Sequence, residues 1–152
     1  MPPGEYLADP TEGVLDPDAL PEPLVENRSR NYRRRACPRC GKGCYRDKCF
    51  ERTLHDLGDP RSGRPRDIRL TYSQHRCEAC GIYFTADTSD LAFPAALYTL
   101  RVVANAVRIV VEDGLPYRTA SWHLWRDHRV FVPFATIQNW VEAAGKKRYS
   151  AG

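Results

Sequence analysis

Two copies of a short cysteine motif constrain this chain more than any other feature of its sequence. Residues 37–41 read CPRCG and residues 77–81 read CEACG, and 36 residues lie between the two pairs of cysteines. Two residues between the cysteines let both thiolates face one ion from a tight turn, and the glycine permits a left-handed backbone there. Four sulfurs match a closed tetrahedral site. The motifs therefore predict one structural Zn²⁺ bound by Cys37, Cys40, Cys77 and Cys80.

The expected compartment decides between a metal site and disulfides, because the chain has six cysteines in 152 residues. The N-terminus has no basic start and no apolar stretch, so it does not indicate a secretory signal. The longest apolar run, residues 100–111, contains two arginines and is too short for a bilayer. We expect a cytoplasmic, nucleoid-associated protein with no membrane contact. In a reducing compartment, closely spaced cysteines hold a metal more often than they form disulfides.

The other cysteines and two histidines leave alternative ligand sets open. Cys44 and Cys49 lie close to the first motif and could form a local knuckle with it, but the second motif would then have no partner. Otherwise these two cysteines have a packing role or none. His55 and His75 are also near enough in the sequence to replace a cysteine as a ligand.

Charge is distributed very unevenly along the chain. Residues 1–27 carry seven acidic residues and no Lys or Arg, and the remainder has 23 basic against 12 acidic residues. This asymmetry indicates a polyanionic partner for the basic part. The acidic, proline-rich start predicts disorder, as a spacer or as a segment that competes with DNA. The arginines that follow, notably Arg33, Arg34 and Arg35, form either a solvated linker or an arm that contacts phosphates.

Residues 36–90 have the pattern of a small β unit, after a tail and basic arm at residues 1–35. Candidate strands cover residues 50–57, 68–74 and 82–85, and apolar residues alternate at Ile68, Leu70 and Tyr72. Residues 58–66 are rich in Gly, Pro and Asp and predict the connecting loop. The predicted fold is small α+β, in which a three-stranded zinc ribbon precedes a three-helix module.

Residues 91–148 have a helical pattern. A first helix is predicted from about Pro94 to Gly114, on apolar spacings of three and four at Leu97, Leu100, Val103, Val107 and Val110. Two more helices are predicted over residues 117–127 and 133–144, joined by the short link 128–132. These proportions are typical of a helix-turn-helix, whose last helix can enter the major groove.

The last predicted helix has a polar face that could read bases. Thr136, Gln138 and Asn139 would face DNA or solvent, because Gln and Asn suit adenine but also occupy ordinary helix surfaces. The cations expected to contact phosphates from this module are Arg118, Arg129, Lys146, Lys147 and Arg148. The three tryptophans are expected in the core of the module rather than as a platform for base stacking.

Several segments together resemble the N-terminal region of bacterial and archaeal insertion-sequence transposases. They are CPRCG at 37–41, RTLHDL at 52–57, RCEACG at 76–81, FT at 84–85 and ATIQNWV at 135–141. The resemblance implies that a ribbon and a helix-turn-helix recognise transposon ends, while a downstream RNase H-like domain performs strand transfer. Because the chain ends at Gly152, we expect it to lack that domain and to be a transposase remnant, a regulator derived from a transposase, or a subunit that acts with a separate transposase.

The sequence thus favours a zinc-dependent protein that binds double-stranded DNA without being an enzyme. Asp87, Asp90, Glu112 and Asp113 lack the separated strand-end pattern that two-metal phosphoryl transfer needs. No catalytic triad, phosphate-cradling loop or open metal site can be assembled from the residues. The alternative is a protein-interaction adaptor in which the ribbon is purely structural; a homo-oligomer is compatible with either function.

Overall fold

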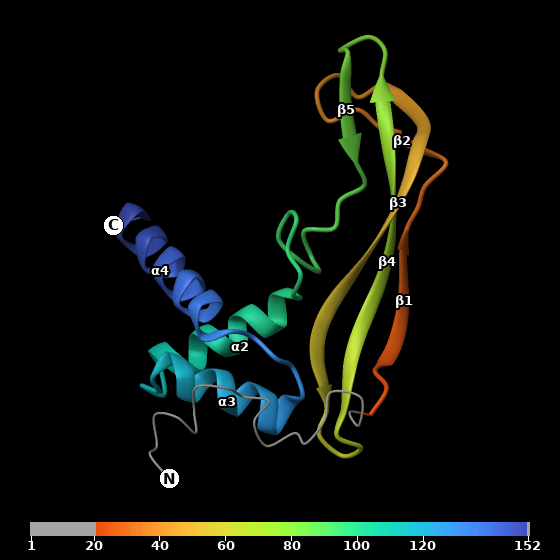
Figure 1. Cartoon of the computed structure of the whole chain (residues 1–152). Coiled ribbons are helices and arrows are strands. Elements are labelled where there is room, and N and C mark those ends of the chain that lie inside the picture. The colour runs from red at the N-terminus through yellow and green to blue at the C-terminus, as the bar shows by residue number, and fades with distance from the viewer. Residues whose placement is uncertain (1–20, 152) are drawn as a thin grey trace.

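The structure is a computed structural model that describes the backbone of residues 21–151 and the side chains of residues 21–145. Its strands are β1 (Leu24–Arg30), β2 (Arg34–Ala36), β3 (Gly43–Asp59), β4 (Arg64–Cys77) and β5 (Ile82–Thr85). Its helices are α2 (Leu100–Val111), α3 (Tyr117–His128) and α4 (Phe134–Ala151). The strands form an elongated sheet and the helices gather beside its lower half (Figure 1). The tail predicted to be disordered lies outside the described residues as far as residue 20.

The hairpin of β3 and β4 is the spine of the sheet. Strand order is β1-β4-β3-β2, and β5 pairs with the last residues of β4. Among the described strands, only β1 runs parallel to its neighbour, whereas the other pairs are antiparallel. The predicted alternation at residues 68–72 is confirmed in part, because Ile68 and Leu70 are buried while Tyr72 is half-buried. With Leu54 and Ala92 they form a small core on the lower half of the hairpin.

The prediction of a three-stranded ribbon is wrong, because the sheet has five strands. The additional strands are β1 and β2, and all of their residues except Ala36 lie in the segment expected to be a tail and basic arm. β1 reads LVENRSR, which is too polar to signal a strand, but an edge strand needs only partial burial and a neighbour with free backbone groups. The segment is held further by Arg30, which pairs with Asp90 at 3.0 Å, and by the Tyr32 N–H, which donates to Ser73 Oγ.

The first helix is shorter than predicted and buries a different face. It begins at Leu100, because residues 97–99 pair with β3: the His55 N–H donates to the Leu97 carbonyl, and the Thr99 N–H donates to the His55 carbonyl. The residues that α2 buries are Val102, Ala106 and Ile109. Backbone pairing with a distant strand therefore overrides the apolar spacing that placed the helix start at Pro94.

The second and third helices agree more closely with the sequence. α3 spans Tyr117–His128 as predicted, whereas α4 starts at Phe134 and continues past the predicted end to Ala151. Their link is fixed by the Ser121 hydroxyl, which donates to the Val132 carbonyl at 2.5 Å. The buried residues of the three helices and their link form the largest core: Val102, Ala106, Ile109, Ala120, Leu124, Val130, Val132 and Ile137. Among the described helices, none is long and apolar enough to cross a membrane.

A buried charge network joins the sheet to the helices. Asp56 of β3 is 1% exposed and accepts hydrogen bonds from the Thr99 hydroxyl (2.7 Å) and from Arg101 Nε (2.6 Å). A second guanidinium nitrogen of Arg101 contacts the other carboxylate oxygen. At Gly58 a Cβ atom would lie 2.8 Å from the His128 carbonyl oxygen, so β3 approaches the end of α3 as only glycine allows. The lower half of the hairpin is thereby attached to the helices.

Candidate metal centre

The two CxxCG segments fold into matching turns at the upper end of the hairpin. In each turn the glycine N–H donates to the carbonyl of the first cysteine, at 2.9 Å for Gly41 and 2.8 Å for Gly81. Both glycines have positive φ, +76° and +69°, as the motif predicts. Backbone N–H groups also point at the first sulfur of each turn, from Arg39 to Cys37 and from Cys80 to Cys77, at 3.4 Å each. The turns therefore direct their sulfurs by backbone geometry alone.

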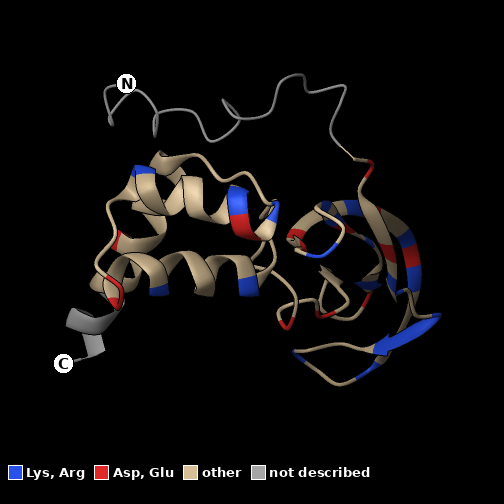
Figure 2. Ribbon diagram, turned by 90° about the horizontal axis from the view of Figure 1, so that it is seen from below, with Lys and Arg blue, Asp and Glu red and all other residues tan. Residues whose placement is uncertain are grey.

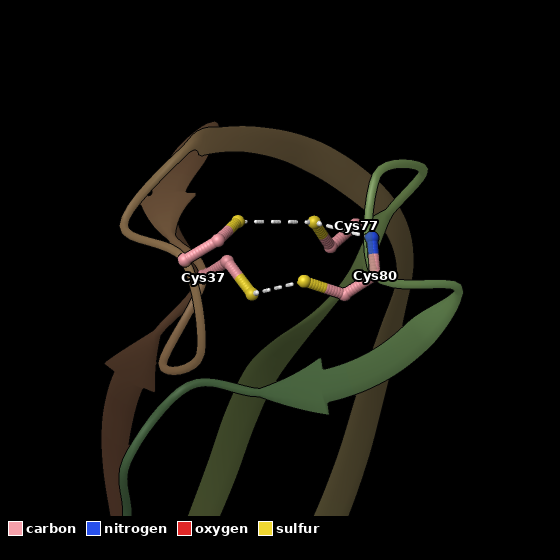
Figure 3. A group of neighbouring side chains, drawn as sticks. Cys37, Cys77 and Cys80 are labelled. Atoms are coloured by element: carbon pink, nitrogen blue, oxygen red, sulfur yellow. Dashed lines mark hydrogen bonds between the residues drawn. The ribbon is translucent and has the colours of Figure 1, made fainter.

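The four predicted cysteines lie together. Their sulfurs are all within 4.8 Å of one another, with 3.6 Å between Cys40 and Cys77 and 4.0 Å between Cys37 and Cys80. A tetrahedral site with metal–sulfur bonds of about 2.3 Å requires sulfurs about 3.8 Å apart, which these two distances bracket. Figure 3 shows the labelled Cys37 across from Cys77 and Cys80, with the sulfurs facing the space between the turns. These four cysteines are close enough to bind one metal ion.

The cluster is reduced and unevenly buried. None of the six cysteines forms a disulfide. Cys37 and Cys77 are buried, Cys80 is half-buried and Cys40 is exposed. The N–H of Cys80 is the main cause that lowers the pKa of the Cys77 thiol to about 6, whereas the hydrogen bond with Cys40 raises the pKa of the Cys80 thiol. A bound cation would favour the thiolate form of all four cysteines.

The alternative ligand sets do not form among the described residues. Cys44 is buried but its thiol faces the carbonyl of Lys42 at 3.3 Å, and Cys49 is exposed on β3. His75 is fully buried with both ring nitrogens in use: Nδ1 donates to the Cys44 carbonyl (3.0 Å), and Nε2 lies 2.7 Å from Ser73 Oγ. His55 lies 2.9 Å from Asp67 instead. Within residues 21–145, no other group of His, Cys, Asp or Glu is arranged to hold a metal.

Positive charge concentrates around the cysteine turns. We call residues 33–49 and 74–85 the metal end of the sheet. Its Lys and Arg residues are all exposed: Arg33, Arg34, Arg35, Arg39, Lys42, Arg46, Lys48 and Arg76. None of them forms a salt bridge with another described residue. Asp47 and Glu78 are the only acidic residues in these two ranges. Figure 2 shows Lys and Arg more densely on the strands than on the helices.

The predicted base-reading residues lie on α4, with differing exposure. Asn139 is exposed, while Thr136 is half-buried near the start of the helix. Gln138 is also half-buried and its amide donates to Glu142 at 3.1 Å, so a base contact would have to replace that bond. Lys146, Lys147 and Arg148 belong to α4, but their side chains lie outside the described residues.

The two predicted phosphate-binding arginines of the helices have different surroundings. The Arg118 guanidinium is exposed and stacks on the ring of Phe134 at 4.3 Å, beside the start of α4. Arg129 caps α3 with φ of +50°, stacks on Trp125 at 5.3 Å and lies against the hairpin turn at Gly63. Arg129 thus packs at the junction instead of facing outward with Arg118.

The tryptophans fit their expected structural role in part. Trp125 is 4% exposed, and Trp140 packs on the helical core in an edge-on contact with Tyr98 at 5.4 Å. Trp122 is half-buried and is not part of that core cluster. None of the three forms a flat exposed platform.

Two features of the site were not predicted from the sequence. One is the set of cations beyond Arg33–Arg35: Arg39, Lys42, Arg46, Lys48 and Arg76. Their closeness to the cysteine motifs in the sequence was a usable signal, because the motifs themselves predict which segments meet. The other is a pair of exposed tyrosines at the metal end, Tyr45 and Tyr83, for which the sequence carries no comparable signal.

Comparison of the chain with protein-family models, with curated proteins and with solved structures finds no match. The resemblance to transposase end-binding regions therefore stays a prediction that depends on the quoted segments alone.

Proposed function

We propose that the protein is a zinc-dependent binder of double-stranded DNA, with its phosphate contacts at the metal end. The observation that carries this proposal is the group of eight exposed cations, without ion-pair partners among the described residues, around a four-cysteine site. Cations that only solubilise a surface are usually interspersed with acids. A surface with eight cations and two acidic residues, fixed on a sheet, favours a polyanion.

Zinc is the proposed ion because of the donor set. Four thiolates in tetrahedral arrangement suit Zn²⁺ or iron, and a closed four-cysteine site leaves no coordination position for catalysis. When bound, the ion supplies structural stabilisation. The two cysteine turns orient β2, the start of β3 and β5. These strands in turn hold the cations in place.

The charges of the sheet and of the helices indicate which part contacts phosphates and which part reads bases. Within residues 91–145 there are five arginines and four acidic residues, and three of those arginines are paired with carboxylates. Up to residue 145 the helices therefore contribute less to the electrostatic attraction than the metal end, and Lys146, Lys147 and Arg148 farther along α4 stay predicted phosphate contacts. Asn139 and Thr136 on α4 remain the proposed base contacts, because phosphate contacts position a protein while base contacts specify the sequence. A transposon end or an operator would be the target.

The salt dependence of binding to a duplex tests this function. Eight phosphate contacts would give a slope of log Kobs against log salt of about −7, and each lost contact reduces its steepness by about 0.9. Replacing Arg33, Arg39 and Lys48 with glutamine should therefore reduce the steepness by about 3. The control makes the same change to glutamine at Arg108 and Arg126, which already pair with Glu112 and Asp127. This control should leave the slope unchanged.

Three results would argue against the proposal. Equal slopes for the two variants would place the phosphate contacts elsewhere. Undiminished binding after the metal is removed would dissociate the cluster from the function. Absence of any duplex binding, with a protein partner retained after nuclease treatment and insensitive to salt, would favour the alternative of an interaction adaptor.

A further inference from the structure

A polar hollow of about 400 Å³ opens at the metal end, where β3 begins and β4 ends. Its charged and aromatic lining residues are Lys42, Tyr45, Arg46, Asp47, Arg76 and Glu78. The hollow is too polar for an apolar segment. Its three cations exceed its two acids, so it favours a ligand that carries negative charge.

Two arginine–tyrosine pairs flank this hollow. The register of β2 and β3 sets Arg34 opposite Tyr45, with the guanidinium carbon 5.5 Å from the centre of the ring. The register of β4 and β5 sets Arg76 opposite Tyr83 in the same way, at 5.7 Å. The pairs come from different hairpins but have the same composition, and Arg76 also lines the hollow.

The tyrosine rings are exposed far more than the fold requires. Tyr45 is 63% exposed and Tyr83 is 56% exposed, and neither belongs to a hydrophobic core cluster. Their arginine partners form no salt bridge with a described residue. Each pair therefore presents an aromatic face and an uncompensated positive charge to solvent.

Aromatic rings alternating with cations match the chemistry of an unpaired nucleic acid strand. Such a strand offers base faces that stack on aromatic side chains and a phosphate on every nucleotide. A duplex offers its phosphates but keeps its base faces stacked inside. Exposed rings beside the cations are thus useful for an unpaired strand and of little use for a closed duplex.

We propose that this surface binds a short unpaired stretch of nucleic acid, with bases stacked on Tyr45 and Tyr83 and phosphates near Lys42, Arg46 and Arg76. The inference rests on the proposed nucleic-acid-binding function and adds a second binding mode to it. The protein then binds where duplex and single strand meet, such as a frayed end or a hairpin.

Fluorescence anisotropy with labelled oligonucleotides tests the inference on the full, zinc-loaded chain. The probes are a 12-nucleotide dT strand, the matching rU strand and a 12-base-pair DNA duplex; the first two distinguish DNA from RNA as the source of the strand. Changing both tyrosines to alanine should weaken strand binding roughly 5- to 150-fold for each ring lost. Duplex binding should change less than about threefold.

Two control variants separate stacking from folding. Tyr45→Phe with Tyr83→Phe keeps both rings and should bind the strand within about twofold of the unaltered protein. Phe93→Ala removes a ring that is 48% exposed outside the metal end and should have no effect. Metal content and far-ultraviolet circular dichroism check that each variant is folded.

The outcomes distinguish this inference from the function on which it rests. Strand binding lost in the alanine variant and kept in the phenylalanine variant supports the inference. Duplex binding without strand binding by the unaltered protein overturns the inference alone. Equal weakening for strand and duplex, or no weakening at all, also overturns it. Failure of the unaltered protein to bind any of the probes overturns the proposed function as well.

Discussion

Removing the metal is predicted to open the metal end of the sheet while the helices stay folded. The metal end buries little apolar surface: Cys37, Cys44 and Cys77 are buried there, with Ile82 and Phe84 packed partly against them. Full burial of an Ile or Phe side chain contributes about 1.5–3 kcal/mol, so these two half-buried residues contribute about 2 kcal/mol together. Ordering the backbone costs about 1–2 kcal/mol per residue. A structural zinc contributes roughly 10–16 kcal/mol, which makes it the dominant stabilising contribution at this end.

Hydrogen exchange read by mass spectrometry measures this opening segment by segment. After chelation, amides of residues 43–49 and 74–85 should exchange at least about 100-fold faster, corresponding to about 3 kcal/mol lost from the local opening free energy. Amides of α2 and α3 should change less than about threefold, because their core and the Asp56 network lie at the other end. Cys49→Ser, which alters an exposed cysteine outside the cluster, is the control and should keep its metal and its protection.

Two results would refute this reasoning. Unchanged protection at the metal end after verified metal loss would mean that the ion is not what holds the turns. Loss of protection throughout α2 and α3 would mean that the sheet and helices unfold as one unit.

Three further predictions address single positions. Gly81→Ala places a Cβ at φ of +69°, where the left-handed backbone costs about 1–2 kcal/mol, so competition with a chelator should show zinc affinity lowered roughly 5- to 30-fold. Burial raises the pKa of the Asp56 carboxyl, but hydrogen bonds from Arg101 and Thr99 outweigh burial and keep this pKa below its ordinary value. The ionised Asp56 therefore stabilises the fold above about pH 4, and this stabilisation is lost as the pH falls further. Urea unfolding of Asp56→Asn should show about 2 kcal/mol less stability at pH 7 and a weaker dependence of stability on acid pH. Asn139→Ala should lower the ratio of specific to non-specific DNA affinity in competition binding, and equal loss on all sequences would argue against base reading by α4.

The metal centre could be predicted from the sequence, because short-range features of the two CxxCG motifs determine it. The spacing within each CxxCG motif fixes the direction of its sulfurs, and the two motifs can share an ion only if the intervening chain folds back. The expected hairpin supplies that fold-back, although β3 and β4 are longer than the predicted strands. The glycines at 41 and 81 adopt the predicted positive φ because the turn itself demands it.

Features set by distant partners were not predictable. β1 is a strand because β4 offers it an edge, and its own polar residues carry no signal of that edge. The start of α2 is displaced because residues 97–99 pair with His55, more than forty positions earlier in the chain. Arg129 looks like a surface cation in the sequence, but in the fold it is half-buried and packs on Trp125 beside the hairpin turn at Gly63. In each case tertiary contacts override the local pattern.

X-ray absorption spectroscopy at the metal edge of the purified protein tests the central claim most directly. We expect one zinc per chain, with four sulfur ligands at about 2.3 Å and no nitrogen or oxygen in the first coordination sphere. Cys44→Ser and Cys49→Ser should leave this spectrum unchanged, whereas Cys77→Ser should remove a sulfur or abolish binding. Iron in place of zinc, a histidine nitrogen among the ligands, or cysteine turns that stay ordered without metal would contradict the account.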